Sequence, residues 1–427
     1  MRLAHARVNF PLTPLMRKSG EIFSLVQSFE RVRRQSVTQT WPVVQYQERR
    51  WAPTEATVDA SWSKRRRRAN RGTYLQAIVP GIAAAKIDLE PATLDAVHQA
   101  TDDLTRFDAQ YQAGAPFEAV LLRSESAASS EIEQLTANAR RISLARLGDG
   151  SRPNATLIAR NTNALEAALQ LAATLDLDAI LTMHRVLFED SAPHHAGKLR
   201  EQPNWIGGDS PVTAMFVPPE HRDVPEALED LVHFMARTDL PALVQAVIAH
   251  AQFETIHPFI DGNGRTGRAL GSAILRSRGT TRNFTVPISS GLLTNTSDYF
   301  EALNEYRQGN IEPIIGRFVK ASSHAMANAQ VLMHDIEQLQ QTILNTAQRV
   351  TKNLKAIATL CTTEPAFTAH MVEQLEIPVS SAYRILNRLV EAGIHRTERK
   401  IRGQSVWSVK GLTDALDAFA QRAGNRL

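Results

Sequence analysis

A histidine and two arginines flank a glycine-rich stretch in the middle of the chain. Residues 257–268 read HPFIDGNGRTGR. Histidine has an ordinary pKa near ~6.5, so His257 could serve as a general base at neutral pH. Asp261 offers a hard oxygen ligand of the kind that Mg²⁺ takes together with phosphate oxygens. Arg265 and Arg268 are three residues apart, a spacing that lets both reach one polyphosphate from a helix.

The residues around this stretch predict two helices joined by a tight loop. The apolar run 241–256 is expected to form a helix that ends before His257, because Pro258 disfavours the α conformation for the residue that precedes it. Gly262, Asn263 and Gly264 favour a turn, and a helical pattern resumes at Arg265. Successive N–H groups at such a helix start can bind an anion.

Three well-known glycine-containing motifs do not fit this stretch. The dinucleotide-binding fingerprint needs a strand before it, whereas a helix is expected here. A P-loop needs Lys and Ser or Thr where Arg268 and Ala269 stand, and an EF-hand needs Gly and Glu where Thr266 and Ser272 stand. A polar turn whose arginines pair with surface carboxylates is the plain structural alternative.

The stretch resembles the HxFx(D/E)GNGRxxR motif of Fic-domain proteins, the Fic/DOC family, and the resemblance extends over about 70–345. It implies transfer of AMP from ATP to a Tyr, Thr or Ser hydroxyl of a target protein, with ATP as co-substrate and Mg²⁺ as cofactor. His257 would deprotonate that hydroxyl, and Asp261 would hold the metal. The implied nucleotide-binding residues are Gly262, Asn263, Gly264, Arg265, Thr266, Gly267 and Arg268.

The resemblance also implies a flap and an adenine pocket. A hairpin predicted over 197–208 lies where the family has an edge strand that aligns the target, and Trp205, Ile206 and Gly207 would form it. The adenine pocket would be lined by Tyr299, Phe300 and Leu303.

A further likeness lies upstream, where residues 129–134 (SSEIEQ) resemble the inhibitory (S/T)xxxE(G/N) helix motif. The implied inhibitory residue is Glu133, which would pair with Arg268 and displace the γ-phosphate. Gln134 departs from the usual Gly or Asn. If Glu133 is an exposed helix residue, its change to Gly should cost only about 1 kcal/mol of stability.

The expected fold is mainly α: a Fic helical domain with a β-hairpin flap, followed by a C-terminal winged helix-turn-helix. The expected domains are a basic and possibly disordered segment (1–71), an N-terminal helical region with the inhibitory helix (72–150), the catalytic domain (151–350) and a winged-helix-like domain (351–427). Periodicity predicts helices over 92–112, 129–147, 162–174, 176–188, 224–236, 241–256, 265–278, 296–308, 311–323 and 326–350.

Basic residues are in excess at both ends of the chain and acidic residues in the middle. In the C-terminal part, helices are expected over 352–361, 367–375 and 379–392, with a basic two-stranded wing after them. Residues 379–402 could therefore contact DNA, and a protein partner is the other interpretation. A DNA-binding regulator with a nucleotide-sensing Fic domain is the second hypothesis for the whole chain, and removal of AMP, with or without its transfer, is the third.

The single cysteine, Cys361, excludes an internal disulfide framework and a cysteine-built metal site. This usage fits a reducing compartment and predicts a cytoplasmic protein. No apolar run is long enough for a membrane span, so no membrane partner is expected. A homodimer is expected only from the family resemblance.

Overall fold

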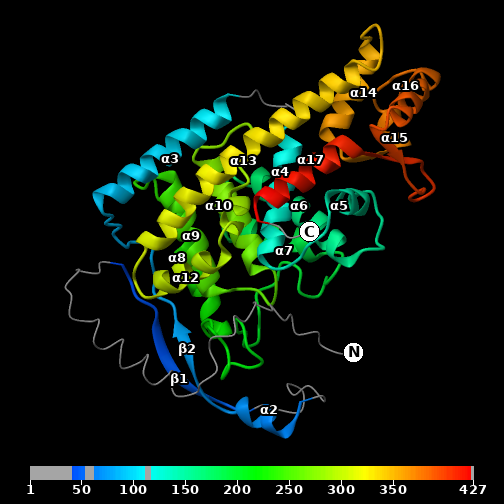
Figure 1. Ribbon diagram of the computed structural model, residues 1–427. Coiled ribbons are helices and arrows are strands. Elements are labelled where there is room, and N and C mark those ends of the chain that lie inside the picture. Colours follow the sequence, from blue (N-terminus) through cyan, green and yellow to red (C-terminus); the bar gives the residue numbers. More distant parts are fainter. Residues whose placement is uncertain (1–40, 53–61, 111–116, 425–427) are drawn as a thin grey trace.

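The computed structural model describes residues 41–52, 62–110 and 117–424. The chain folds into a mainly helical body, as the sequence predicts (Figure 1). The helices of this body are α3 (Pro91–Ala109), α4 (Phe117–Ile132), α5 (Ala139–Arg146), α6 (Pro153–Gln170), α7 (Leu177–Phe188), α8 (Val224–Met235), α9 (Ala242–Ile256), α10 (Asn263–Ser277), α11 (Ile288–Leu293), α12 (Thr296–Arg307) and α13 (Glu312–Leu344). In the described part of the chain, no helix combines the length and apolar character that a bilayer crossing requires.

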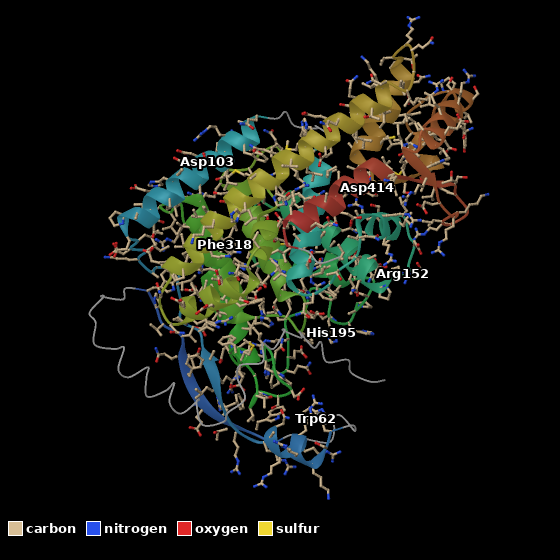
Figure 2. All side chains as sticks on the ribbon, in the orientation of Figure 1. Trp62, Asp103, Arg152, His195, Phe318 and Asp414 are labelled. Atoms are coloured by element: carbon tan, nitrogen blue, oxygen red, sulfur yellow. The ribbon has the colours of Figure 1, made fainter. Side chains whose placement is uncertain are left out.

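The core of the body lies around α9. Residues 243–256 are all buried, so this helix is covered on every side by its neighbours. It packs against α8, α10, α12 and α13. Figure 2 shows Phe318 of α13 inside the body, whereas Asp103 and Arg152 lie at its periphery. A helix held on all sides is a rigid support for the loop that follows it.

Helix α13 is one continuous helix of 33 residues, where the sequence analysis expected two, over 311–323 and 326–350. No glycine or proline interrupts the chain between the two predicted helices. Ser322 and Ser323 bond back to the carbonyl of Val319 within the same helix, so these polar residues are accommodated without a break. In Figure 1, α13 runs beside α3 and continues to the C-terminal module.

The sequence analysis expected residues 1–71 to be a basic and possibly disordered segment. The structure describes 41–52 and 62–71 of it, which contain a strand and a helix, and residues 1–40 and 53–61 lie outside the described parts. Strand β1 (Gln45–Trp51) pairs in antiparallel fashion with β2 (Gly72–Ile78), so the predicted boundary at 71 cuts through one sheet. The run of five basic residues forms α2 (Lys64–Ala69), with Ser63 as its N-cap. Arg66 of α2 bonds to Asp209 through two nitrogens, at 2.7 and 2.5 Å.

The predicted helix 129–147 is two helices. α4 ends at Ile132 and α5 begins at Ala139, with Asn138 as its N-cap. Gln134, between them, has φ of 64°, in the left-handed region. The periodicity of the apolar residues did not predict this break, because the residues on both sides of it are compatible with a helix.

The C-terminal module contains α14 (Lys352–Thr363), α15 (Ala369–Glu373), α16 (Val379–Glu391) and α17 (Lys410–Arg422). A three-stranded sheet joins them, with β3 (Ala366–Thr368), β5 (Val406–Val409) and β4 (His395–Thr397) in the order β3–β5–β4. The order of helices and strands follows the predicted one, with β3 replacing the start of the helix expected at 367–375. α17 returns to pack against α13, α4 and α5, so the module shares the core of the body.

Close contact between α11 and α13 yields a stability prediction. A Cβ added at Gly291 would lie 2.0 Å from the carbonyl oxygen of Ala321, which is backbone and cannot yield. We therefore expect Gly291→Ala to lower the free energy of unfolding by about 2–3 kcal/mol or more. Gly316→Ala is the matched control, because nothing lies near its Cβ; it should raise stability by about 1 kcal/mol. Urea unfolding measures both, and equal effects would contradict the packing argument.

Candidate functional site

The loop between α9 and α10 is held by its own side chains. α9 ends at Ile256, as predicted, and His257 follows in the left-handed conformation with φ of 51°. Asn263 closes the loop: its Oδ1 accepts the N–H of Phe259 at 2.8 Å and its Nδ2 donates to the carbonyl of the same residue at 2.9 Å. Gly262 has φ of 77°, and a Cβ there would lie 2.5 Å from the ring of Phe188. Only glycine fits that position.

His257 is nearly enclosed, with 15% of its side chain exposed. Its carbonyl accepts a hydrogen bond from Arg200 Nε at 2.9 Å, and its Nδ1 lies 3.9 Å from Glu254 Oε2. Burial, helped by the positive charges of Arg200 and Arg307, lowers the pKa of His257 to about 3. The ring is therefore neutral at physiological pH.

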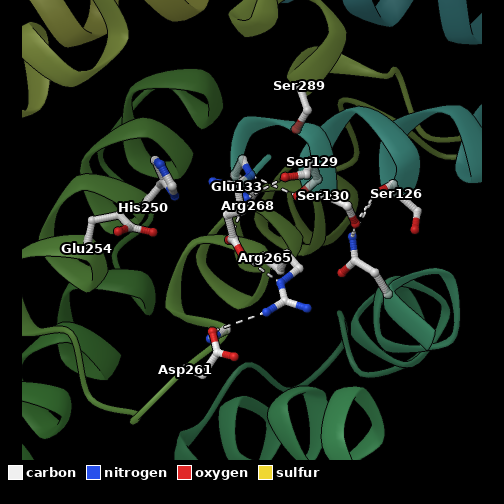
Figure 3. Close-up of polar contacts among 12 residues, drawn as sticks. Ser126, Ser129, Ser130, Glu133, His250, Glu254, Asp261, Arg265, Arg268 and Ser289 are labelled. Atoms are coloured by element: carbon white, nitrogen blue, oxygen red, sulfur yellow. Dashed lines mark hydrogen bonds and ion pairs between the residues drawn. The ribbon is translucent and has the colours of Figure 1, made fainter. Parts of the chain in front are cut away.

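The two arginines of the motif converge on one carboxylate (Figure 3). Glu133 Oε2 lies 2.7 Å from Arg265 Nε, and Glu133 Oε1 lies 2.9 Å from Arg268 Nη2. The two arginine side chains are 3% and 4% exposed. The sequence analysis expected the pair with Arg268 but not the one with Arg265.

The charges in this cluster compensate one another. Burial by itself would raise the pKa of Glu133, but the positive charges of Arg265 and Arg268 outweigh burial and hold that pKa below its ordinary value. Glu133 is therefore ionised at neutral pH. It is not an exposed helix residue, since it lies in the turn after α4 and only 17% of its side chain is exposed.

Ser129, one helical turn before Glu133, completes the environment of Arg268. Its hydroxyl and its carbonyl oxygen each accept a hydrogen bond from the guanidinium, at 2.8 Å. Gly264 makes room for this arrangement, because a Cβ there would lie 2.5 Å from Glu133 Oε1. The motif glycine is thus required where the carboxylate approaches the start of α10.

Asp261 and the start of α10 provide the remaining polar groups. Asp261 Oδ1 accepts the N–H of Gly262 at 2.6 Å and lies 3.3 Å from Arg265 Nη2, while 41% of the side chain is exposed. Gly262 therefore donates its N–H within the loop, and the N–H groups of Asn263, Gly264 and Arg265, at the start of α10, have no intrahelical acceptor. Burial raises the pKa of Asp261.

This donor set fits a polyphosphate and a divalent cation. Two guanidiniums and two backbone N–H groups surround a space that a carboxylate now enters, which is the chemistry of an anion site. The described residues contain no group of three or more His, Cys, Asp or Glu placed to hold a metal by themselves. Asp261 fits a Mg²⁺ ion that takes its other ligands from phosphate and water.

Thr266 and Gly267 lie on the buried side of α10. Thr266 is 2% exposed, and a Cβ on Gly267 would approach Phe253 and His250 at 3.0 and 3.1 Å. These two positions support the packing of α10 on α9. Their expected role in nucleotide binding stays a prediction.

The hairpin predicted over 197–208 is not formed; the flap residues lie in a longer loop with one bridged pair. Ile206 and Phe216 form an isolated antiparallel bridge, with the N–H of Ile206 donating to Phe216 at 2.9 Å. Gly207 and Gly208 have φ of 70° and 72°, and this left-handed backbone ends the pairing of the two strands. The four prolines within 203–219 also lack the N–H that a β-ladder needs. Residues 207–215 therefore form a loop that is closed by this one bridged pair.

The loop carrying Trp205 is tied to the motif. Asn204 Nδ2 donates to the carbonyls of Phe259 and Ile260, at 3.1 and 3.3 Å. The ring of Trp205 lies edge-on to that of Trp51 of β1, with centroids 5.8 Å apart. The flap residues are therefore adjacent to the loop between α9 and α10, while their contact with a target stays a prediction.

The expected adenine-pocket residues lie on α12. Tyr299 and Leu303 are 1% and 3% exposed, and Phe300 is partly buried against the core. The Tyr299 hydroxyl lies 2.7 Å from His250 Nε2. The structure gives Tyr299 and Leu303 a packing role, and their contact with adenine stays a prediction.

The sequence analysis missed several residues that shape the site. Arg200 donates to the carbonyls of His257 and Pro219, and Glu254 lies one turn before the histidine. The spacing of 254 and 257 on one helix was a visible signal for Glu254. The sequence held no such signal for Arg200, because its partners are backbone atoms far away in the sequence.

The fold and the site define a helical domain with an anion-binding helix start beside a neutral histidine. Residues 174–275 match the Fic/DOC family. The chain contains a Fic domain.

Named relatives share this region. The chain is 28% identical over 171 residues to "Protein adenylyltransferase fic-1" of Caenorhabditis elegans, which is 40% of this chain and 31% of that protein. It is 30% identical over 154 residues to "Protein adenylyltransferase Fic" of Nematostella vectensis, which is 35% of this chain and 33% of that protein. The chain thus spans about a third of the length of these relatives.

Solved structures of Fic proteins are also similar. A Fic family protein from Desulfovibrio desulfuricans G20 matches with a TM-score of 0.49 and 18% identity, over 76% of this chain and 98% of that one. Fic-1 of C. elegans matches with a TM-score of 0.43 and 22% identity, over 57% and 72% of the two chains.

The turn that carries Glu133 makes a second prediction. The N–H of Leu135 bonds to Ser130 and that of Gln134 to Glu131, at 3.1 and 2.7 Å, which closes the end of α4 around a left-handed residue. Glycine adopts that conformation without the penalty that Gln134 carries. We expect Gln134→Gly to raise the free energy of unfolding by about 1 kcal/mol.

Gln134→Ala is the control for this change, because it removes the same side chain but keeps the Cβ. Chemical denaturation should show no gain for it. An equal gain in both variants would mean that the side chain, and not the backbone conformation, limits stability.

Proposed function

We propose that this chain is a protein adenylyltransferase that transfers AMP from ATP to a Tyr, Thr or Ser hydroxyl of a target protein and is autoinhibited by Glu133. One observation carries the proposal: two buried arginines at the start of α10 meet a single carboxylate next to a neutral histidine. The named relatives are protein adenylyltransferases, which supports the same chemistry.

Each residue of the site has a distinct task in this reaction. Arg265 and Arg268, with the N–H groups of Asn263 and Gly264, would bind the ATP phosphates and compensate their charge. His257, neutral in this environment, would take the proton of the target hydroxyl as its oxygen attacks the α-phosphorus and pyrophosphate leaves. Asp261 would hold Mg²⁺, which neutralises phosphate charge when bound. Positioning of the reactants would supply most of the remaining rate.

Glu133 would inhibit by occupying the arginines. A γ-phosphate that binds Arg268 must replace the carboxylate, since both are anions and the guanidinium already has Ser129 as its other partner. ATP bound without that contact would have its α-phosphate out of line for attack. A small misplacement of the reacting groups costs far more in rate than in affinity.

Two further functions stay as candidates for the chain. Glu133 could instead help to remove AMP from a modified target by positioning a water. DNA binding through 379–402 is favoured by the exposure of Arg384 on α16 and of Arg396 and Lys400 beside it. Arg399, by contrast, is already paired with Asp149 of the body. A DNA-shift assay beside the transfer assay separates these functions.

The role of His257 is tested by His257→Ala. AMP transfer should fall to background because no other described group takes the place of the base, whereas ATP binding should persist because the arginines are unchanged. The measurement is incorporation of AMP from ATP labelled in its α-phosphate, together with ATP affinity. His233→Ala, an exposed histidine on α8, is the matched control and should transfer normally. Transfer that survives in His257→Ala would reopen the choice of base.

The role of Glu133 is tested by Glu133→Gly. Transfer should rise strongly, because both arginines become available to phosphate. Stability without nucleotide should fall by about 3–5 kcal/mol, since two buried cations lose their carboxylate. Mg²⁺-ATP should restore much of that loss, so its thermal shift should exceed the one for wild type. Equal transfer rates in variant and wild type would exclude autoinhibition.

The double variant Glu133→Gly with Arg268→Ala separates release of the arginine from a general loosening of the site. It should return to low transfer, because Arg268 is the group that Glu133 withholds. High transfer in the double variant would mean that Glu133 acts through another residue.

A further inference from the structure

Strands β1 and β2, together with the short helix α2, lie at the end of the molecule away from α16 (Figure 1). We call the described residues of this part, 45–51 and 62–78, the basic arm. They include eight Lys or Arg and one Glu, whereas the middle of the chain has an excess of acidic residues. Figure 2 shows side chains that spread outward from α2, next to the labelled Trp62.

Most cations of the basic arm have no anionic partner. Arg66 is paired with Asp209, and Arg49 lies 3.3 Å from Glu220. Six further cations are exposed and form no ion pair or side-chain hydrogen bond with any residue that the structure describes: Arg50, Lys64, Arg65, Arg67, Arg68 and Arg71. Like charges three or four residues apart on a helix repel one another. An acidic partner would therefore stabilise α2.

The basic arm is fixed to the loop over 204–217. Arg66 Nε and Nη2 donate to the two carboxylate oxygens of Asp209 at 2.7 and 2.5 Å. The hydroxyl of Thr213 donates to Asn70 Oδ1 at 3.1 Å. Both ends of α2 are thus tied to this loop, so its exposed cations have a defined place beside the loop.

The same loop lies beside His257. Asn204 Nδ2 donates to the carbonyls of Phe259 and Ile260, which follow the histidine in the motif. The chain from Asn204 to Asp209 can span at most about 18 Å. A protein that presents a hydroxyl to His257 therefore comes within reach of the basic arm.

The arm fits an acidic protein better than a nucleic acid. Proteins that bind single strands add aromatic side chains on which bases stack. Helix α2 contains no aromatic residue, and Trp62 next to it is only 7% exposed. The candidate DNA contacts, over 379–402, lie at the other end of the molecule (Figure 1). The arm is instead attached to the loop beside the histidine.

We propose that the basic arm binds an acidic segment of the target protein, a run of Asp or Glu close to the hydroxyl that receives AMP. This inference rests on the proposed function, because it assigns the class of target for that reaction. An extended segment advances about 3.3 Å per residue, so the acidic run should begin within about ten residues of the hydroxyl. Exposed ion pairs are individually weak, and several cations must therefore act together.

Binding is tested with three labelled peptides of equal length, in which Gly alternates with Glu, Gln or Lys. We expect the full chain to bind the Glu peptide about tenfold or more tighter than the Gln peptide at about 50 mM salt, and not to bind the Lys peptide. Raising the salt to about 500 mM should remove most of the preference, because screening weakens exposed charge pairs. Fluorescence anisotropy measures these affinities.

A triple charge reversal on α2 tests the surface: Arg65→Glu, Arg67→Glu and Arg68→Glu. It should abolish the preference for the Glu peptide and leave the weak binding of the Gln peptide unchanged. The fold should persist, because all three side chains are exposed and unpaired among the described residues, and thermal unfolding checks this. The milder Arg67→Gln with Arg68→Gln should lose part of the preference.

The matched control makes the same change of charge on exposed residues of the C-terminal module: Arg384→Glu, Arg396→Glu and Lys400→Glu. It should keep the preference for the Glu peptide. Unchanged preference in the α2 variant, or an equal loss in both variants, would overturn the proposed surface.

A DNA duplex of mixed sequence is the competing probe. We expect the reversal on α2 to leave its binding unchanged. A duplex that binds more tightly than the Glu peptide and loses that binding in the α2 variant would assign the arm to nucleic acid and overturn the proposal.

Target selection is tested with the Glu and Gln peptides, each extended by a Tyr-Thr-Ser acceptor block, in the Glu133→Gly variant. The kcat/KM of AMP transfer should be about tenfold higher for the Glu peptide, and the reversal on α2 should bring the ratio to about one. Equal transfer to both peptides would overturn selection by the arm. Loss of all transfer in every variant would contradict the proposed function, while the binding measurements would still decide whether the arm binds acidic segments.

Discussion

The site depends on the compensation of two buried cations. Arg265 and Arg268 stand in the first two turns of α10, where the helix dipole and the low exposure both disfavour positive charge. An anion must lie between them, and in this structure it is the carboxylate of Glu133. The same requirement explains why Gly264 has no side chain and why Ser129 accepts a hydrogen bond from Arg268. In the proposed reaction, ATP phosphates would meet the same requirement, so carboxylate and nucleotide would compete for one place.

The neutral histidine depends on a related arrangement. The guanidiniums of Arg200 and Arg307 and the surrounding core keep His257 unprotonated, while the buried α9 fixes where the ring emerges. Asn263 then sets the loop so that the first turn of α10 begins beside it. His257 and the two arginines are thus held by one rigid corner between two helices, and neither requires a long flexible segment.

Local pattern predicted most of this corner from the sequence. The end of α9 before His257, the turn at Asp261 and Gly262 and the helix that carries both arginines are all governed by nearby residues. The prediction failed where distant contacts decide. The break at Gln134 accompanies an ion pair across 132 residues of chain, and Ile206 is bridged to Phe216, which lies beyond the predicted hairpin. Tyr299 and Leu303 have an apolar environment that periodicity could not distinguish from a ligand pocket.

The position of α17 has a consequence for synthesis. A nascent chain leaves the ribosome N-terminus first, so α4 to α13 can pack before α17 is available. Until α17 docks, Asp417 cannot accept the N–H of Ala139, and the apolar side of α5 stays in contact with water. During synthesis, the corner between α9 and α10 can therefore form before α17 packs against α4 and α5. The rate at which α17 is translated and docks sets how long that interval lasts.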